Sequence, residues 1–427
     1  MRRLNIAIIG LGNIGSYLYK YLNDNKKILT EKNNCLPLIK YVSAKNKKRK
    51  RNIKIQKSQW LNNYLEATKL KDVDLIIELI GGSEGPAKKL VFNALKNKKH
   101  VITANKALIA KYGDQLAKIA EKNKVNLEFE ASVCGGVPII RSLKEGLIAN
   151  KISKIYGIFN GTSNYILSSM DKENKSFNEV LIKAQKLGFA ETNPASDLNG
   201  DDVSSKLKIL SSLCFNSFLN NNIYVEGIKK IDKTDIDNAN KLGYKIKLLG
   251  FAEHLNNKIY QRVHPTLIKK ESYVASIDGV LNAVIIDGKP VGQSTIQGEG
   301  AGAAATTSAL VSDISSILRG NIKFPFSLSN KERKKLKFQN IDRRLFSAYL
   351  RFEVDDKSGI LSNITNIFSR NKVSIKRLVQ NPHKSKKSSS IIIITHKSED
   401  RFLQKTLREV DRKNYVRHKS KLIRIDE

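Results

Sequence analysis

The first fifteen residues constrain the fold more than any other stretch of the chain. An apolar run at residues 4–9 (LNIAII) leads directly into GLGNIG at residues 10–15, and apolar residues at helical spacing follow. A strand, a glycine-rich turn and a helix in this order form the dinucleotide-binding fingerprint, in which backbone and helix N-terminus approach a pyrophosphate. A plain glycine-rich turn is the alternative. The fingerprint predicts cofactor contacts at Gly10, Gly12, Asn13, Ile14 and Gly15.

Further β/α units follow this start, which predicts a doubly wound α/β sheet. The pattern predicts strands and helices that alternate, with strands at 36–43, 73–80, 100–103 and 125–130 and helices at 86–95 and 107–122. Ligands of such sheets bind beyond the carboxyl ends of the strands. Three more cofactor contacts are therefore expected just after or at the end of a strand, namely Gly81, Thr103 and Lys106.

The chain is strongly basic, with 76 Lys and Arg against 40 Asp and Glu and a formal net charge of +36. Most of this charge is spread along the sequence without a nucleic-acid-binding motif, which predicts solvated faces. Only residues 45–51 (KNKKRKR) form a dense run, and they follow the second expected strand. NAD enzymes usually carry an acid there for the ribose 2′-hydroxyl, whereas cations would bind a 2′-phosphate. We predict that Lys45 and Arg49 favour NADP(H) over NAD(H).

Residues 188–210 (GFAETNPASDLNGDDVSSKLKIL) combine acids and a lysine within a loop that turns into an amphipathic helix. Asp202 and Lys206 are four residues apart and share one helix face. A surface ion pair is the structural alternative. The crowding of acids around one lysine instead favours a site that grips a substrate ammonium and holds a proton-donating amine. The four carboxylates are Glu191, Asp197, Asp201 and Asp202.

Two glycine-rich segments each allow two interpretations. At residues 128–138 (EFEASVCGGVP), a bent backbone beside Glu130 suits a hard monovalent cation or a plain β-turn, and composition favours the turn. At residues 298–302 (GEGAG), the glycines open a helix and suit a cofactor's polar part or close packing. The cofactor interpretation adds Gly300 and Gly302 to the expected contacts.

The C-terminal part reads as a separate βαββαβ module, a ferredoxin-like fold, over residues 345–427. It contains no catalytic constellation, which predicts a regulatory or dimerising role. Residues 331–344 are charged and lack an apolar period, so we expect a linker. The three cysteines form neither a disulfide framework nor a zinc motif, and no signal pattern or membrane-length apolar run occurs. These features predict a reduced, cytoplasmic protein without membrane or nucleic-acid partners.

Read in order, these segments resemble a monofunctional homoserine dehydrogenase with a C-terminal ACT domain. The resemblance covers nearly the whole chain, through GLGNIG, DLIIELIGG, TANK, FEASVCGGVPII, NGTSNYIL, residues 188–210, LGYKIKLLG and GEGAGAAATTSALVSDI. It implies NAD(P)-linked interconversion of L-aspartate 4-semialdehyde and L-homoserine, for threonine, methionine and isoleucine synthesis. An amino-acid-aldehyde dehydrogenase of different specificity is the alternative, and an ACT-regulated nucleic-acid-binding protein is a more distant one.

The resemblance also implies an organisation of the chain. A Rossmann domain is expected at residues 1–130, completed by a returning helix near 300–320. An α+β catalytic and dimerisation domain with an open mixed sheet is expected at 131–320, followed by the linker and the ACT domain. A homodimer or homotetramer is implied. At residues 354–361 (VDDKSGIL) the module resembles sites for amino-acid effectors such as threonine, with Ser358 in place of a common proline.

Roles carry over from the family residue by residue. Lys206 matches the proton-donating lysine, and Lys106 a second active-site lysine near cofactor and substrate. The substrate-binding positions match Glu191, Asp202, Asp197, Gly188, Asn160 and Thr162. In the family a sodium ion is bound by one carboxylate and three backbone carbonyls, which match Glu130, Val133, Gly135 and Val137. The resemblance thus reverses the preference for a plain turn at this segment.

Overall fold

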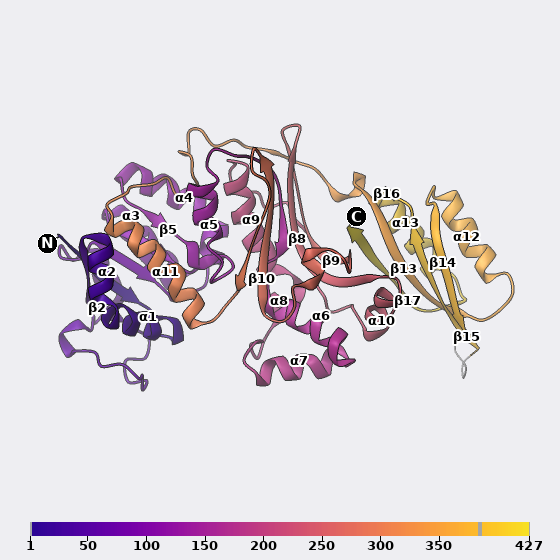
Figure 1. The fold of residues 1–427 in the computed structure, drawn as a ribbon, viewed down its shortest axis with the longest axis horizontal. Helices are drawn as coiled ribbons and strands as arrows, with labels where there is room; N and C mark the ends of the chain where they lie inside the picture. The colour runs from indigo at the N-terminus through magenta and orange to yellow at the C-terminus, as the bar shows by residue number, and fades with distance from the viewer. Residues whose placement is uncertain (1, 383–386, 427) are drawn as a thin grey trace.

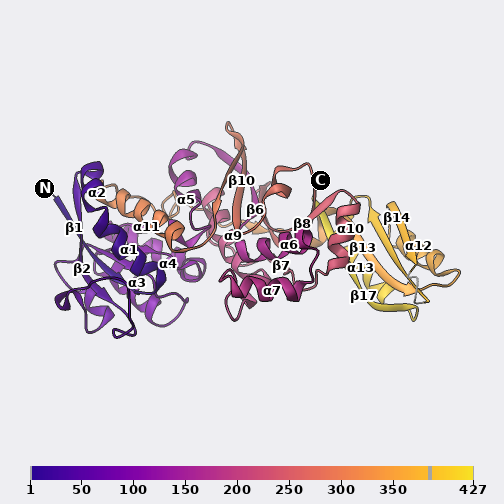
Figure 2. The same ribbon diagram turned by 60° about the horizontal axis from the view of Figure 1, so that its bottom comes forward.

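The computed structural model describes residues 2–382 and 387–426 and arranges them in three lobes along one axis (Figures 1 and 2). An N-terminal lobe lies at one end, a mixed-sheet lobe in the middle and a C-terminal module at the other end. None of the helices in the described ranges combines the length and apolar character that a bilayer span requires.

The N-terminal lobe is a parallel sheet of five strands in the order β2-β1-β3-β4-β5. The strands are β1 (Arg2–Ile9), β2 (Cys35–Ser43), β3 (Leu75–Glu78), β4 (His100–Thr103) and β5 (Leu127–Glu128). The helices are α1 (Asn13–Asp24), α2 (Lys26–Asn33), α3 (Pro86–Lys96) and α4 (Lys106–Asn123). Every residue of β3 (LIIE) is buried, because helices cover a parallel sheet on both faces. The predicted α/β class is confirmed.

One helix of this lobe comes from far along the chain. Helix α11 (Ala303–Leu318) leaves the middle lobe and packs against α1, visible as the orange helix among indigo and purple elements in Figure 1. Its buried Leu310 and Ile314 share an apolar cluster with Leu18 of α1 and Ile8 of β1. The N-terminal lobe is therefore built from two separate parts of the sequence.

The last strand of this sheet is shorter than the predicted strand 125–130, because β5 ends at Glu128. Glu130 instead begins a 3-10 turn. Its backbone N–H donates to the carboxylate of Asp313, and its own buried carboxylate accepts two further backbone N–H groups. These long-range bonds draw the backbone out of the ladder, and the local apolar pattern carries no sign of them.

The middle lobe is an open mixed sheet in the order β11-β10-β6-β8-β9. Its strands are β6 (Lys151–Ile158), β8 (Tyr244–Leu255), β9 (Lys258–Lys269), β10 (Leu281–Lys289) and β11 (Gly292–Glu299). The short strand β7 (Tyr224–Val225) pairs in parallel with β9. The helices are α5 (Ile139–Arg141), α6 (Gly161–Glu173), α7 (Phe177–Lys186), α8 (Ala195–Asn199), α9 (Asp201–Cys214) and α10 (Lys233–Lys241). Helix α9 packs on β6, β8 and β9, and these contacts hold it at the boundary with the N-terminal lobe.

The C-terminal module has the predicted βαββαβ order, with the two-residue strand β16 (Ser398–Glu399) added. Its other elements are β13 (Leu345–Asp355), α12 (Ile360–Arg370), β14 (Ile375–Pro382), β15 (Ser388–Thr395), α13 (Asp400–Asp411) and β17 (Val416–Asp426). The sheet order is β17-β13-β15-β14. Strand β17 also pairs in parallel with β9, so the sheets of the module and the middle lobe are continuous.

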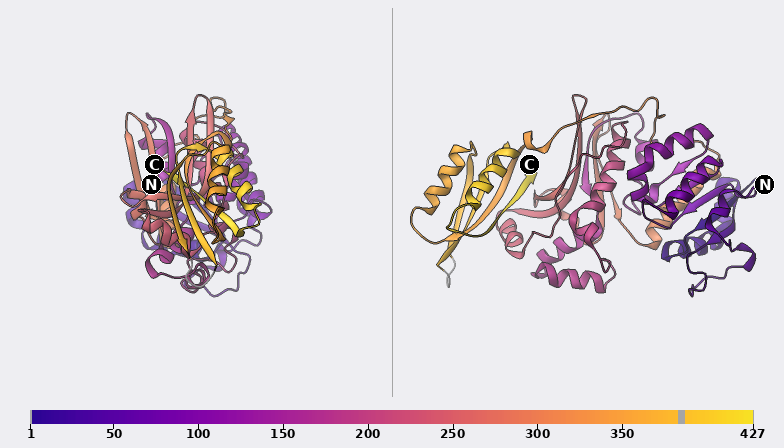
Figure 3. Two further views of the ribbon diagram at one scale, coloured as in Figure 1. Left: turned by 90° about the vertical axis from the view of Figure 1, so that its right-hand side faces the viewer. Right: turned by 180° about the vertical axis from the view of Figure 1, so that it is seen from behind.

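The predicted linker, residues 331–344, runs along the middle lobe to the module (Figure 3) and pairs with that lobe. Strand β12 (Lys337–Phe338) pairs with β9. Arg333 is buried, and its guanidinium donates to the carbonyl oxygen of Ser217 and to Asp114. A charged segment without apolar period can pack in this way because a planar guanidinium satisfies several acceptors at once.

Candidate active site

Two lysines from different lobes share one carboxylate at the boundary between the N-terminal and middle lobes. Lys206 and Asp202 lie one turn apart on α9, with Nζ 2.8 Å from Oδ2. Lys106, the first residue of α4, places its Nζ 3.0 Å from the other oxygen, Oδ1. Lys206 and Asp202 are buried, whereas 41% of the Lys106 side chain is exposed. The structure thus adds to the predicted pair a third partner that the local spacing could not connect.

The charge state of this cluster follows from its contacts. Burial alone would raise the pKa of Asp202, but attraction to Lys206 and Lys106 outweighs it and lowers that pKa well below its usual range. Burial opposes the ammonium of Lys206, yet the Asp202 carboxylate outweighs it and raises the lysine's pKa. Both groups therefore stay ionised at neutral pH. The sequence left this balance open, because burial and attraction act in opposite directions.

Asn160 joins the acids of the predicted substrate site. It precedes α6, where its Oδ1 accepts the N–H of Ser163 as a helix cap. Its amide nitrogen donates to Asp197 Oδ1 at 2.7 Å and to Asp202 Oδ2 at 2.8 Å. Burial raises the pKa of Asp197, the Asn160 hydrogen bond opposes that shift, and repulsion from Asp202 adds to it. Asn160 therefore fixes both carboxylates in one position relative to Lys206.

The other predicted substrate residues surround a loop at the edge of this cluster. The hydroxyl of Thr162 donates to the carbonyl oxygen of Phe189 at 2.7 Å, which ties α6 to the loop. Gly188 has a φ of +76°, a left-handed conformation that favours glycine. Glu191 is exposed, and among the described residues its carboxylate makes no hydrogen bond or ion pair. The structure therefore leaves this carboxylate free for a ligand and does not join it to the lysines.

The glycines of the first turn meet two different requirements. Gly10 has a φ of +110°, and a Cβ there would lie 2.4 Å from the carbonyl oxygen of Leu79. A Cβ on Gly15 would lie 2.0 Å from the carbonyl oxygen of Gly10. Gly12, by contrast, has no described atom within 4 Å of an added Cβ. It precedes α1 without a side-chain cap, so the first N–H groups of the helix, from Asn13, Ile14 and Gly15, are available to an anion.

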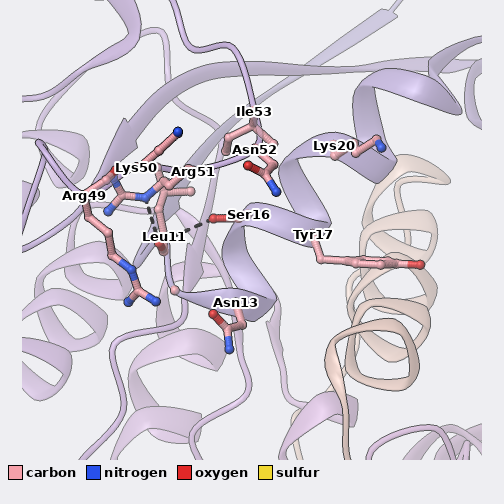
Figure 4. Close-up of a pocket in the computed structure, with 11 residues that line it drawn as sticks. Leu11, Asn13, Ser16, Tyr17, Lys20, Arg49, Lys50, Arg51, Asn52 and Ile53 are labelled. Carbon is pink, nitrogen blue, oxygen red and sulfur yellow. Dashed lines mark hydrogen bonds between the residues drawn. The ribbon is translucent and has the colours of Figure 1, made fainter.

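A cavity of about 390 Å³ opens beside this turn, between α1 and the basic loop (Figure 4). Its cationic walls include Arg49, Lys50 and Lys20. Lys45 is exposed and is not among the residues that line this cavity, whereas Arg49 is. Sequence reasoning missed Lys50, although it belongs to the same dense run.

Arg51 also lines this cavity, and its hydrogen bonds organise the basic loop. Its Nε donates to the carbonyl oxygen of Leu11 at 2.9 Å (dashed in Figure 4), and its other nitrogens donate to the carbonyl oxygens of Asn46 and Arg49. The guanidinium also lies 5.7 Å from the ring centroid of Trp60. Arg51 thereby holds the loop against the glycine turn, a role that sequence spacing did not indicate.

The ends of β3 and β4 are joined by Glu78, a buried residue that sequence reasoning missed. One carboxylate oxygen accepts the N–H groups of Ile80 and Gly81, and the other accepts the hydroxyl of Thr103 at 2.5 Å. Thr103 also accepts the N–H of Asn105, the residue before α4. The Thr103 hydroxyl is therefore engaged within the protein, and it anchors the start of α4, the helix that begins at Lys106.

Gly300 and Gly302, the two glycines before α11, differ as Gly15 and Gly12 do: one is closely packed and the other has open space around it. A Cβ on Gly300 would lie 2.3 Å from the side chain of Asn282, so close packing demands glycine there. Gly302 has a φ of +110°, precedes α11 without a side-chain cap and has no described atom within 4 Å of an added Cβ. Of the two predicted contacts, Gly302 has room for a cofactor, and Gly300 supports the loop.

Glu130, the predicted cation-binding carboxylate, is buried between the N-terminal and middle lobes with an exposed fraction of 2%. Burial raises its pKa to about 7, although the N–H groups of Arg141 and Ile140, at 2.6 and 2.9 Å, partly offset this shift. The carboxylate therefore has backbone donors, and among the described residues it forms no ion pair, although attraction to Arg141 and Lys144 also lowers its pKa.

The loop after Glu130 supplies the predicted carbonyl ligands. Among the described residues no hydrogen bond reaches the carbonyl oxygens of Val133 and Gly135, whereas that of Val137 accepts the N–H of Ile139 at 2.7 Å. Nowhere in residues 2–382 and 387–426 do three His, Cys, Asp or Glu side chains gather as metal ligands. A cation at this loop would therefore depend on backbone oxygens, and two unpaired carbonyls beside a buried carboxylate fit a monovalent ion.

A second candidate site lies in the C-terminal module. A cavity of about 280 Å³ is lined by residues 354–361 together with Gln380 and Ile391. Asp355 at its rim accepts Arg417 Nε at 2.7 Å, and this hydrogen bond lowers the pKa of Asp355. The cavity is small and lined by both polar and apolar residues, which suits a small amino acid.

A buried ammonium kept protonated at the mouth of a dinucleotide-binding sheet is the arrangement of a nicotinamide-dependent dehydrogenase that acts on a carbonyl group. Three family models match the chain in order: the homoserine dehydrogenase NAD-binding domain at residues 10–130, homoserine dehydrogenase at 138–315 and the ACT domain at 348–412. Homoserine dehydrogenases of Neisseria gonorrhoeae and Helicobacter pylori are each 37% identical, over 100% of this chain and 99% of theirs. The chain belongs to the homoserine dehydrogenase family, as the sequence resemblance predicted.

Solved structures agree with this assignment. A homoserine dehydrogenase from Thiobacillus denitrificans has a TM-score of 0.93 at 34% identity, covering 100% of this chain and 99% of that one. An archaeal homoserine dehydrogenase solved with NADPH shares the fold at 23% identity, with a TM-score of 0.63 over 74% of this chain and 97% of that one. The predicted three-part architecture with a C-terminal ACT domain is thus confirmed.

Proposed function

We propose that the protein reduces L-aspartate 4-semialdehyde to L-homoserine, reversibly and with NADPH as the preferred donor, in threonine, methionine and isoleucine synthesis. The observation that carries the proposal is the buried Lys206 ammonium, paired with Asp202 and lying beside Lys106 at the mouth of the dinucleotide-binding sheet. Family membership supports the reaction, and the contacts of this cluster support the roles of its residues.

Lys206 is the proton donor. Its ammonium has three N–H bonds, of which one is directed to the carbonyl oxygen of Phe159 at 2.6 Å and one to Asp202 at 2.8 Å. The third remains for the aldehyde oxygen, where it stabilises the developing alkoxide and then delivers the proton. Asp202 keeps the amine charged before the reaction. The nicotinamide, when bound, supplies the hydride for the aldehyde carbon.

The acids around Lys206 bind the other end of the substrate. Glu191 offers a free carboxylate for the α-ammonium, because its side chain is exposed and without a partner among the described residues. Asp197 and Asp202 are held by the Asn160 amide nitrogen. Lys106 shares Asp202 from the N-terminal lobe, so it connects the cofactor side of the cleft to the substrate side.

NADP(H) is the preferred cofactor and NAD(H) the alternative, because Arg49 and Lys50 line the cavity beside the pyrophosphate turn. Both side chains are exposed there and can hold a 2′-phosphate through charge-assisted hydrogen bonds. A sodium ion, or another monovalent cation, would be held by Glu130 and the carbonyl oxygens of Val133, Gly135 and Val137. It would neutralise a carboxylate whose burial now disfavours its charge.

The remaining parts of the proposal concern regulation and assembly. Threonine is the candidate effector at the ACT cavity, where residues 354–361 form most of the wall. The protein works in the cytoplasm as a homodimer or homotetramer, as the family resemblance implies. Glycine and serine residues near 358–359 leave the cavity mouth uncrowded, which suits a small hydroxylated amino acid.

The absorbance of NADPH tests the reaction directly. Purified protein is mixed with NADPH and L-aspartate 4-semialdehyde, and in parallel with a panel of other amino-acid-derived aldehydes, each with and without threonine. Faster oxidation with aspartate semialdehyde than with every other aldehyde is expected. Equal or faster turnover of another aldehyde would assign the scaffold to a different amino-acid-aldehyde dehydrogenase.

A further inference from the structure

Two buried arginines of the ACT domain, Arg351 and Arg424, bind carboxylates of the middle lobe. Arg351 pairs with Asp235 of α10, and Arg424 reaches β7 and the residue that follows it. Arg424 of β17 is 1% exposed. Its Nε and Nη2 donate to Asp400, the first residue of α13, at 2.7 and 3.0 Å. Its Nη1 lies 3.3 Å from Glu226 Oε2, and its Nη2 lies 3.2 Å from the hydroxyl of Tyr224, which itself donates to Glu226. One guanidinium thus holds an ACT carboxylate and a catalytic-lobe carboxylate together.

The residues after Glu226 support the substrate segment directly. The N–H of Ile228 donates to the carbonyl oxygen of Leu198 in α8 at 2.9 Å. A Cβ on Gly227 would lie only 2.0 Å from that same oxygen, so the two backbones touch. Leu198 follows Asp197, whose carboxylate accepts Asn160 at 2.7 Å. The backbone that carries Glu226 is therefore in contact with the helix that carries a predicted substrate acid.

We propose that Arg424 and Glu226 form a clamp by which the ACT domain positions α8, and with it Asp197, for substrate binding. The effect expected on enzyme kinetics depends on the proposed function. Arg424 and Glu226 touch neither substrate nor cofactor and act as positioning residues. The buried guanidinium keeps a fixed geometry because two carboxylates and a hydroxyl bind its planar donors from both lobes. Losing the Glu226 carboxylate leaves Tyr224 as the remaining partner of Arg424 in β7, which loosens the 226–228 backbone against α8.

A matched pair of variants isolates this contact. Glu226→Ala removes the clamp, whereas Glu253→Ala removes another ion pair between the catalytic lobe and the segment leading to the ACT domain, Glu253 with Arg344 at 2.5 Å. The two glutamates have nearly equal side-chain exposure, 27% and 25%. Steady-state kinetics of the full-length protein give KM for aspartate semialdehyde and for NADPH, and hydrogen exchange with mass spectrometry follows residues 195–200. Tyr224→Phe provides a milder second variant that keeps the ring.

Glu226→Ala is expected to raise KM for the semialdehyde by about two- to thirtyfold, the scale of coupling through a contact network, with KM for NADPH unchanged. Amide exchange at 195–200 is expected to quicken in Glu226→Ala and, less strongly, in Tyr224→Phe, but not in Glu253→Ala. If Glu226→Ala fails to fold, the smaller rise in KM and faster exchange of Tyr224→Phe decide the matter. Equal behaviour of the Glu226 and Glu253 variants, or a parallel rise in both KM values, would overturn the clamp. If the wild-type protein did not turn over aspartate semialdehyde, the proposed function would fail, and the exchange data would still test the clamp.

Discussion

Two groups of cations serve the proposed reaction in opposite surroundings. Lys206 is buried against Asp202 and the carbonyl oxygen of Phe159, whereas Arg49 and Lys50 are exposed on a loop beside the cofactor turn. A buried charge interacts strongly with each neighbour, and water cannot compensate for a contact that is lost there. Exposed charges interact more weakly because solvent and salt screen them. The rate of the chemical step should therefore depend on single residues in the buried cluster. The choice between NADPH and NADH should depend on a sum of weaker contacts at the basic loop.

Removing the buried amine is the severest way to test that contrast. Lys206→Ala should lower kcat for semialdehyde reduction by about 100-fold or more, the scale of general acid catalysis, because no other ammonium lies in its place. Lys208→Ala is a matched control on the same helix, since its Nζ contacts Asn221 outside the cluster. A loss of less than about fivefold for Lys206→Ala would remove this residue from the proton-donating role.

Neutralising the partner should change the pH dependence of the buried amine. Burial lowers the pKa of Lys206, and Asp202 is the largest of the groups that raise it, so in Asp202→Asn the pKa of the lysine falls. Reduction needs the protonated amine and is lost as pH rises through that pKa. The alkaline limb of kcat should therefore move to lower pH by about one unit or more. Asp201→Asn, at the exposed neighbouring position, should leave the limb in place, and an unmoved limb in Asp202→Asn would contradict the assigned coupling.

Glu191 is exposed, as Arg49 and Lys50 are, but like Lys206 it belongs to the proposed substrate site, where it is assigned to bind a charged group. Glu191→Leu should raise KM for aspartate semialdehyde about tenfold or more, the scale of a hydrogen bond between charged groups. The KM for NADPH should stay the same, because the glycine turn is in the other lobe. An unchanged KM for the semialdehyde would place the ammonium site elsewhere.

The cluster also shows how much of the site the sequence could predict. Asp202 and Lys206 were found because an interval of four residues on a helix is local information. The strand-end position predicted Lys106 only as a cofactor contact, and the family resemblance alone gave its catalytic role and the role of Asn160. The fold brings both residues to Asp202 from other parts of the chain. The α/β class followed from the regular alternation of strands and helices, which repeats along the chain and tolerates local errors.

Sequence reasoning failed where a long-range polar contact decides the local structure. The predicted strand 125–130 stops early because the backbone and carboxylate of Glu130 bond to distant partners. Glu78 was missed because a buried glutamate in a strand of apolar residues has no recognisable spacing to Thr103. Arg424 was missed for a similar reason, since its two carboxylate partners belong to separate lobes.

The basic loop offers the mildest test of the comparison and the most direct test of cofactor choice. Arg49→Ala should lower the ratio of kcat/KM for NADPH to that for NADH by about three- to tenfold, because a charge-assisted contact is lost at an exposed site. Lys45→Ala is the matched control in the same basic run, and its side chain does not line the cavity. The effect of Arg49→Ala should shrink as salt is raised, whereas that of Lys206→Ala should persist. A wild-type preference for NADH of about tenfold, or equal effects of the Arg49 and Lys45 variants, would show that the cavity does not select the 2′-phosphate.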